Sequence, residues 1–592
     1  MKKGLFLIPL AAAMMASCSN DFDENNGFNG ETEIHYLAVN IVDVADNGTR
    51  ADLPGKYENG TDDENQVKSI RFYLFDKNGN KFATTPYTDA TAEPVNNDET
   101  TNVEKKLQAV IVFESKKADG SAEDKHPAKI VAIVNPPESL PDFATVGALQ
   151  DAVANYNLTT AGSFVMTNAV YLDGTNKEHV AYDIQEANIK ESKAAALAAP
   201  VEIYVERVVA KARVNLASSL EKLAGHDNVY KLANNSGKAT VYKADGSTEE
   251  KEIYVELLGW NVTGTAPQSR LVKKLTEGWS SSDKFVWGVN NEWNVADYHR
   301  SFWALNPSTV ASKGALSFGN FNGRVSDANI NPANGQGVAA FDGQHPVYLQ
   351  ENAAWDATTG ADPGYGTKLI IAARLVDDQA QPISLGWYAG SYYLKETLEQ
   401  VMLTNAKIFK KTTQDGDVVN YVPALKNDVP VKFITSTAAG DFDNSGERKP
   451  TVSNEVNRYN SYAQANLTQL PENLYIKNDD GTYSPISSLE ALNDALKQVG
   501  TVKLWDNGYT YYWLDITHLA PENMYGHVGI VRNHIYDYEI GSFVGFGIPV
   551  LNDSETIYPE TPNDPEMMYI AARINILSWR LVNHANAQLG WN

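Results

Sequence analysis

Hydrophobic and polar residues alternate with a period of two along much of this chain, which is the pattern of half-buried β-strands. One strand is predicted over residues 31–44, where Leu37, Val39 and Ile41 fall on one face. Another is predicted over residues 567–586, where the apolar face carries Ile570, Ala572, Ile574 and Ile576. Further strands are expected at residues 67–75, 107–113, 129–134, 201–216, 252–262, 367–376, 503–516 and 531–544. The pattern therefore predicts a mostly β chain.

Stretches of strong helix formers are short, so only a few short helices are expected, separated from the strands by long loops. The helices are placed near residues 144–155, 187–198, 392–406 and 488–499. Asp76–Asn80 is predicted to form a hairpin turn, because its Asn-Gly pair readily adopts positive φ. Residues 438–466 are polar and rich in glycine and asparagine, which predicts a surface loop.

The chain of 592 residues is long enough for two to four domains. After the predicted strand at residues 201–216, the sequence becomes richer in aromatic residues and in irregular stretches. We therefore place a domain boundary at this point. It gives an N-terminal β domain of residues 51–218 and a C-terminal β domain of residues 219–592.

The first eighteen residues have the pattern of a secretory signal peptide. Lys2 and Lys3 precede an apolar run from Leu5 to Met15, which is too short to span a bilayer and ends in Ala16-Ser17-Cys18. Cys18 is the only cysteine of the chain, so we expect lipid attachment there and no internal disulfide. An ordinary signal peptide with an incidental cysteine is the alternative. Residues 19–50, which contain the first predicted strand, are then a propeptide.

Composition excludes several classes of function. The net charge is −25 and the longest basic runs are two or three residues, so nucleic-acid binding is not expected. No apolar stretch of 18 residues follows the leader, so membrane contact is expected only through the lipid on the precursor. An acidic surface keeps an exported protein soluble.

The sequence carries no strong catalytic or metal-binding motif. It lacks a G-x-S-x-G elbow, an H-E-x-x-H pair and a P-loop, and no nucleophilic cysteine follows the leader. Asp441–Gly446 resembles the start of a calcium loop, but the twelfth position is Val452 where glutamate is needed. We expect no enzyme activity, no cofactor and no metal. The abundance of carboxylates leaves a glycosidase pair open as a remote alternative.

The aromatic segment Gly508–Asp515 allows two interpretations. Its rings are able to form a platform on which a sugar stacks, or they pack in the core and across neighbouring strands. Alternating aromatic residues on a sheet more often pack, so packing is the favoured prediction.

The order of elements along the chain suggests a route to assembly. The strand at residues 31–44 lies just before Thr49-Arg50 in a polar loop, which is the kind of segment that proteases cut. Cleavage between Arg50 and Ala51 would remove the strand and leave a groove bordered by unpaired backbone groups. The C-terminal strand of another copy could fill that groove, and such head-to-tail filling does not close. The alternative is that residues 31–44 form a permanent edge strand and residues 567–586 a permanent central one.

Several segments, in this order, resemble the major-subunit fimbrillins of Bacteroidales type V pili, in the short-fimbria branch. Besides the leader ending at Cys18, they are Thr49–Ala51, Asn65–Asp76, Val205–Lys211, Gly259–Thr263, Ser269–Lys274, Asp297–Trp303, Val531–Tyr536, Gly545–Val550 and Ile574–Trp579. The resemblance implies two transthyretin-like β-sandwich domains with Greek-key topology. It also implies export as a lipoprotein to the outer membrane and cell surface, where the fimbria stands.

Assembly and partners follow from the same resemblance. It implies cleavage after Arg50 by an arginine-specific protease, and polymerisation by donor-strand exchange with other copies of the chain. The further expected partners are tip, accessory and anchor pilus subunits and surface receptors of the host or of other bacteria, in adhesion and biofilm formation. The alternative function is a surface glycan-binding lipoprotein, which lipid anchoring, acidity and aromatic residues suit equally well.

Overall fold

The structure is a computed structural model, and it describes part of the chain. The described residues are 32–44, 60–82, 93–94, 103–116, 126–154, 159, 163–172, 178–243, 245, 247–266, 268–274, 316–317, 341–343, 346–352, 367–414, 418–435, 462–517, 529–552, 556–557, 569–578 and 581–583. Strands dominate this part of the chain and the helices are few and short, so the predicted mostly β fold is confirmed.

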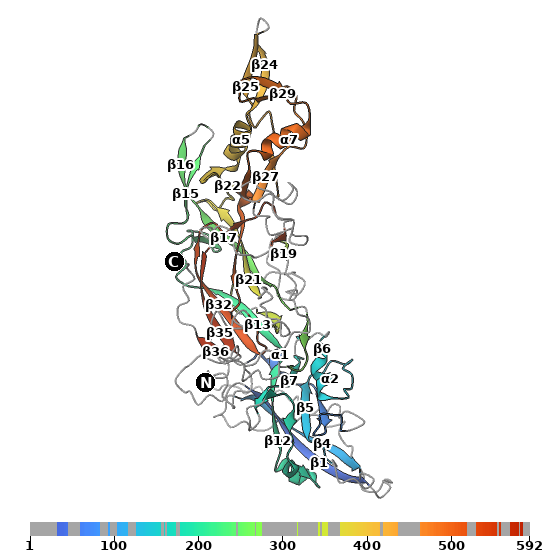
Figure 1. The fold of residues 1–592 in the computed structure, drawn as a ribbon. Coiled ribbons are helices and arrows are strands. Elements are labelled where there is room, and N and C mark those ends of the chain that lie inside the picture. Colours follow the sequence, from blue (N-terminus) through green and yellow to red (C-terminus); the bar gives the residue numbers. More distant parts are fainter. Residues whose placement is uncertain are drawn as a thin grey trace, which may run out of the picture.

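The molecule is elongated, with successive sheets arranged along its length (Figure 1). One end is formed by a nine-stranded sheet. Its strands are β1 (Thr32–Val44), β2 (Ile70–Phe75), β3 (Glu93–Pro94), β4 (Val103–Lys116), β5 (Lys129–Val134), β7 (Met166–Asn168), β10 (Tyr182–Asp183), β11 (Ile189–Lys190) and β12 (Val201–Arg207). Three helices belong to this half of the chain, namely α1 (Asp62–Asn65), α2 (Val146–Asp151) and α3 (Lys193–Leu197).

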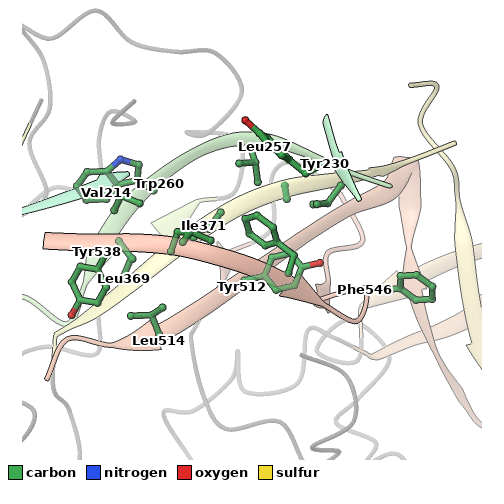
Figure 2. Close-up of a cluster of buried hydrophobic side chains, with 14 of the residues drawn as sticks. Val214, Tyr230, Leu257, Trp260, Leu369, Ile371, Tyr512, Leu514, Tyr538 and Phe546 are labelled. Carbon is green, nitrogen blue, oxygen red and sulfur yellow. The ribbon is translucent and has the colours of Figure 1, made fainter. Parts of the chain in front are cut away.

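The middle of the molecule is a sandwich of two five-stranded sheets. The first contains β13 (Val209–Leu216), β20 (Val347–Gln350), β32 (His534–Val544), β35 (Tyr569–Ser578) and β36 (Leu581–Asn583). The second contains β14 (Val229–Lys231), β17 (Tyr254–Thr263), β21 (Lys368–Val376), β31 (Tyr509–Asp515) and β33 (Ile548–Pro549). Buried side chains from both sheets meet in one cluster, which we call the C-terminal core, and Figure 2 shows Trp260, Ile371, Tyr512 and Tyr538 within it.

Two further sheets extend the molecule away from the nine-stranded sheet (Figure 1). The seven-stranded one contains β15 (Lys238–Tyr242), β16 (Thr248–Glu252), β22 (Leu385–Tyr388), β23 (Ser391–Leu394), β26 (Lys432–Thr435), β27 (Tyr462–Asn466) and β30 (Thr501–Trp505). The four-stranded one contains β24 (Ile408–Gln414), β25 (Val418–Pro423), β28 (Leu474–Lys477) and β29 (Tyr483–Pro485). The helices α5 (Lys395–Asn405) and α7 (Leu489–Lys497) pack here, with Leu398, Met402, Leu492 and Leu496 in a shared core.

The remaining described strands pair two by two. They are β6 (Val153–Ala154) with β18 (Ser269–Arg270), β8 (Tyr171–Leu172) with β9 (Glu178–His179), and β19 (Leu316–Ser317) with β34 (Thr556–Ile557). The first of these brings the segment around Leu271 and Val272 onto the N-terminal half, where both side chains are buried.

The predicted strand at residues 201–216 is two strands, β12 and β13, which lie in different sheets. The chain changes sheet at Val208, whose backbone N–H donates to the carbonyl of Val165 at 3.0 Å. The boundary predicted after residue 218 remains a prediction, but sheet membership changes about ten residues earlier, at Val208.

The predicted strand at residues 503–516 is also divided, into β30 and β31. Asn507 and Gly508 adopt φ of 52° and 73°, in the left-handed region that interrupts a strand. A Cβ at position 508 would lie 2.2 Å from the carbonyl oxygen of Leu375, so only glycine fits. The hairpin predicted at Asp76–Asn80 is confirmed, with Gly79 at φ 79° and the N–H of Asp76 bonded to the carbonyl of Asn80 at 2.8 Å.

Candidate strand-exchange site

Strand β1 lies inside the N-terminal sheet, between β4 and β12. It pairs antiparallel with β4 along its whole length and parallel with β12 from Val39 to Asp43. It also pairs briefly with β11 at Tyr36 and Leu37. The alternative that residues 31–44 form an edge strand is therefore wrong, because both sides of the strand carry backbone ladders.

The positions predicted to form the apolar face of β1 lie opposite buried neighbours. Leu37 pairs with Ile111 and Val39 with Ala109 on β4, and both of these β4 side chains are 2% exposed. On the other side, Val39 and Ile41 pair with Val201 and Ile203. Directly opposed positions in a sheet belong to the same face, so the three predicted positions lie on the face of the buried residues.

These neighbours belong to one cluster, which we call the N-terminal core. Its members come from β2, β4, β5, β7 and β12 and include Ile70, Phe72, Leu74, Ile130, Ala132, Val134 and Met166. Because β1 joins β4 to β12, its removal would separate two walls of this core. The opening would be bordered by the backbone groups of β4 and β12 that now pair with β1, which is the chemical character of a strand-accepting groove.

The C-terminal strand β35 is docked on its own chain, antiparallel to β32. The predicted apolar positions Ile570, Ala572, Ile574 and Ile576 pair with Phe543, Ile540, Tyr538 and Tyr536, respectively. All four of these β32 side chains are fully buried in the C-terminal core. The predicted face of β35 is therefore on the core side of the sheet, as strand alternation requires.

The outer side of β35 is weakly covered. Strand β36 pairs with it only from Asn575 to Leu577, and β36 is the last strand of that sheet. Without β35 and β36, the first sheet of the sandwich keeps β20, β13 and β32, and the second sheet keeps all five of its strands. Withdrawal of β35 and β36 would thus leave most of the described sandwich in place.

Buried polar contacts hold helix α1 at the junction of the two halves (Figure 1). Helix α1 begins with a capping box in which Thr61 and Glu64 exchange bonds. The Glu64 carboxylate is 1% exposed and accepts from Lys211 Nζ at 3.0 Å and from the Tyr348 hydroxyl at 2.7 Å. Burial disfavours its charged form, but Lys211 and Tyr348 outweigh burial and hold the pKa of Glu64 below its ordinary value.

Two buried arginine side chains also link segments at this junction. Arg207 donates to the carbonyl of Glu64 at 3.3 Å and to the Asn533 side chain at 3.1 Å. Arg532 donates to Glu351 at 2.7 Å and to the Leu271 carbonyl at 3.0 Å. These bonds join segments of both halves, so the junction is fixed by charge-assisted hydrogen bonds.

A neighbouring ion pair, between Lys273 Nζ and Glu206 at 2.8 Å, is buried entirely. Burial raises the pKa of the Glu206 carboxyl, against the opposing charge of Lys273. The segments Val205–Lys211, Ser269–Lys274 and Val531–Tyr536 were singled out in the sequence, but the pairing of their charged residues with one another was not predicted. The signal was available, because charged residues inside apolar strands are buried only when they are paired.

Several predicted site residues lie outside the described residues, namely Cys18, Arg50 and Ala51, together with the calcium-like segment Asp441–Gly446. Lipidation and cleavage there stay predictions, and so does the expectation that Asp441–Gly446 binds no metal. Within the described ranges, no group of three or more histidine, cysteine, aspartate and glutamate residues is arranged to hold a metal. Nor does any helix in that part of the chain have the length and apolar character needed to cross a bilayer.

The aromatic strand at residues 509–515 packs as predicted. Tyr511 and Tyr512 are 2% and 0% exposed, in two different buried clusters. The Trp513 ring is covered by Lys368, whose Nζ lies 4.3 Å from the ring centroid. The buried Tyr511 and Tyr512 rings are therefore not available as a sugar platform.

Residues 36–205 match the profile of a family described as "Major fimbrial subunit protein (FimA)". The predicted resemblance to fimbrillins is therefore confirmed over this part of the chain, which contains most of β1, all of β4 and the residues of β12 that pair with β1. A search of the curated proteins finds no match to this sequence.

Solved structures that are similar to the chain include a fimbrilin from Porphyromonas gingivalis W83. It shares 10% identity at a TM-score of 0.35, covering 93% of this chain and 98% of that one. A putative cell adhesion protein from Bacteroides eggerthii shares 10% identity at a TM-score of 0.32, covering 94% and 98%. The tip fimbrial protein Mfa3 from Porphyromonas gingivalis, with a C-terminal truncation, shares 10% identity at 0.26, covering 92% and 100%.

Proposed function

We propose that this chain is a structural shaft subunit of a cell-surface fimbria, without catalytic activity, that polymerises by exchange of strands. The observation that carries the proposal is the position of β1. It is an inner strand opposite buried residues of the N-terminal core, and the loop that contains Arg50 follows it in the sequence. The match of residues 36–205 to the fimbrial family supports the same conclusion.

The proposed route begins with export as a lipoprotein attached through Cys18 to the outer membrane. An arginine-specific protease then cuts after Arg50, and residues 19–50 leave with β1. The vacated groove accepts the strand carrying Ile570, Ala572, Ile574 and Ile576 from the next copy. Each backbone hydrogen bond regained contributes about 0.5–1.5 kcal/mol, and apolar burial adds about 25 cal/mol per Å².

Two features of the C-terminal strand suit it as the donor. It spans ten residues, Tyr569–Ser578, which is close to the length of the thirteen-residue β1 that it would replace. It is also covered on its outer side only by the three-residue β36. Repetition of the step gives an open head-to-tail filament. In this proposal the filament, with its tip and anchor subunits, supports adhesion and biofilm formation.

The sharpest test is N-terminal sequencing of filaments sheared from the cell surface, combined with negative-stain electron microscopy. Filaments whose subunits begin at Ala51 are the expected result. Surface protein that stays monomeric, with residues 32–44 still protected from hydrogen exchange in their own sheet, would overturn the proposal. Saccharide-dependent tryptophan fluorescence from such monomers would favour a glycan-binding protein instead.

A further inference from the structure

Strand β25 is an exposed edge at the end of the molecule farthest from β1 (Figure 1). The four-stranded sheet runs in the order β25-β24-β28-β29, so β25 pairs with β24 on one side only. No described residue pairs with its other side. An unpaired edge is a ready template for another strand.

Hydrogen bonding shows which backbone groups of β25 face outward. Just beyond the strand, the N–H of Ala424 donates to the carbonyl of Ile408 at 3.0 Å, across the ladder to β24. Antiparallel pairs alternate between bonded and non-bonded positions, so Val422 and Asn420 also direct their backbone groups inward. The N–H and C=O groups of Val419 and Tyr421 therefore point to the open side.

Apart from Pro423 at its end, this edge lacks the features that normally protect an edge strand. Of the four large hydrophobic residues that are exposed in the described chain, two lie on β25 and a third just after it: Val419 at 44%, Val422 at 42% and Leu425 at 55%. Val418–Pro423 contains no charged residue, whereas edge strands usually carry lysine or other charges. The opposite edge, β29, has only three residues and ends in Pro485.

The strand is also held in an extended shape. The Tyr421 ring stacks on Tyr483 with centroids 4.1 Å apart and planes 3° apart, and it meets the edge of Tyr475 at 5.0 Å. On the neighbouring strand, the Thr412 hydroxyl donates to the Asn420 carbonyl at 3.4 Å. A partner strand would therefore bind a preorganised edge at a small cost in entropy.

We propose that β25 is a self-association surface, on which β25 of a second copy pairs antiparallel about a two-fold axis at Asn420. In this register Val419 of one copy faces Tyr421 of the other, and the outward groups of both residues form four backbone hydrogen bonds. Valine opposite an aromatic ring is a favourable cross-strand pair. The strand is thus complementary to itself, as a two-fold interface requires.

A pair of six-residue strands buries little surface, so the contact between two free subunits is weak. Repetition along a filament would multiply it, joining filaments side by side through many copies at once. This extension to filaments rests on the proposed function, whereas the pairing of two subunits does not. Because each copy carries a net charge of −25, salt should strengthen the pairing by screening repulsion.

Disulfide trapping tests the register directly. Cys18 is the only cysteine, so the full chain with Cys18→Ser accepts one new thiol without ambiguity. In the proposed register the two copies of Asn420→Cys lie directly opposite each other, at a pair of positions without backbone hydrogen bonds between them. Cα atoms at such positions lie about 4.5 Å apart, which allows a disulfide to form. Val422→Cys is the matched control, because its two copies would lie roughly 13 Å apart despite greater exposure.

We expect a covalent dimer from Asn420→Cys in mild oxidant, at a yield at least about tenfold above that of Val422→Cys. Equal yields, or a higher yield from position 422, would overturn the proposed pairing. The result does not depend on cleavage at Arg50 or on polymerisation, so its failure would leave the proposed function standing.

A second pair of variants tests the hydrogen bonds without a thiol. Val419→Pro removes a backbone N–H that points to the open side of β25 and none that bonds to β24, so the four-stranded sheet tolerates the change. A partner strand would lose the hydrogen bond that this N–H donates. Val419→Thr keeps the donor and the β-branched shape. By sedimentation equilibrium we expect Val419→Pro to weaken self-association about tenfold and Val419→Thr to leave it nearly unchanged. Self-association of Val419→Pro at the wild-type level would refute the proposal.

Discussion

The first described strand, β1, and the long C-terminal strand, β35, are both paired within their own chain, but their surroundings differ. Strand β1 has a long neighbour on one side and a five-residue parallel ladder on the other, and both walls contribute to the N-terminal core. Strand β35 has one long neighbour, β32, and a three-residue cover. Removal of β1 would separate two walls of a core, whereas β35 is next to the last strand of its sheet and is held on its outer side by only three paired residues of β36.

This difference gives the proposed exchange a direction. An open N-terminal core exposes apolar surface and unpaired backbone groups, so filling it is strongly favourable. Loss of β35 exposes one side of β32 and reduces its sheet to β20, β13 and β32, but the facing sheet keeps all five of its strands. The N-terminal end is therefore the acceptor and the C-terminal end the donor. The predictions below test that assignment, beginning with the largest effect.

Blocking the cut should abolish assembly. Arg50→Ala removes the predicted cleavage site, so β1 stays between β4 and β12 and the groove never opens. We expect folded precursor that retains residues 19–50 and no filaments by electron microscopy. Arg50→Lys is the matched control for charge, since an arginine-specific protease should also fail on it. Filaments from either variant would show that removal of β1 is not needed.

A charge on the proposed donor face should also stop polymerisation. Ile574→Asp places a carboxylate at a position opposite Tyr538, on the core face, where an unpaired charge costs several kcal/mol. Asn575→Asp adds the same charge on the other face of the strand and is the control. We expect processed monomers from the first variant and filaments from the second, separated on mild-denaturant gels. Equal assembly of the two would remove β35 from the donor role.

Much of this arrangement could be predicted from the sequence, because alternation of apolar residues identifies a strand and its core face. The predicted strand at residues 67–75 illustrates this success, because its alternating Ile70, Phe72 and Leu74 lie together in the N-terminal core. Alternation does not specify the partner of a strand, so the place of β1 between β4 and β12 could not be predicted. Nor did the continuous pattern at residues 201–216 show that the chain changes sheet at Val208.

The junction network was missed for a related reason. Glu64 and Lys211 are far apart in sequence, and their contact at 3.0 Å depends on how α1 folds against β13. A charged residue in an apolar strand indicates that a partner exists without saying which residue it is. Local pattern thus predicts elements and faces, while long-range pairing requires the structure.

The buried Glu64 should stabilise the segment that remains after β1 has left. Glu64→Gln keeps the shape but leaves Lys211 without its counter-charge, so we expect a loss of about 2–4 kcal/mol in the free energy of unfolding. Thr61→Ser, which keeps the cap, is the control. Urea denaturation at neutral pH measures both, and a loss below about 0.5 kcal/mol for the glutamine variant would contradict the role given to Glu64.

The same pair sets a pH dependence whose sign follows from the lowered pKa of Glu64. A carboxyl whose pKa is lower in the folded state than in the unfolded state stabilises the fold above its unfolded pKa. That contribution is lost as the pH falls through the folded pKa. Wild-type stability should therefore fall on acidification more steeply than that of Glu64→Gln. Parallel pH profiles would show that Glu64 does not contribute in this way.

The smallest effect on the fold of the monomer is expected from removing the donor strand itself. Deletion of residues 567–592 takes away β35 and β36, yet leaves the facing sheets of the C-terminal core and the whole N-terminal sheet. We expect a folded monomer whose hydrogen exchange increases mainly in β32, since that strand becomes an edge. Deletion of residues 1–50, which removes β1, should instead increase exchange throughout β4 and β12 and in the core strands β2 and β5. The strand that leaves most easily is the one whose absence the remaining fold tolerates best. If the C-terminal deletion increased hydrogen exchange more widely than the N-terminal deletion, the assignment of acceptor and donor ends would therefore be wrong.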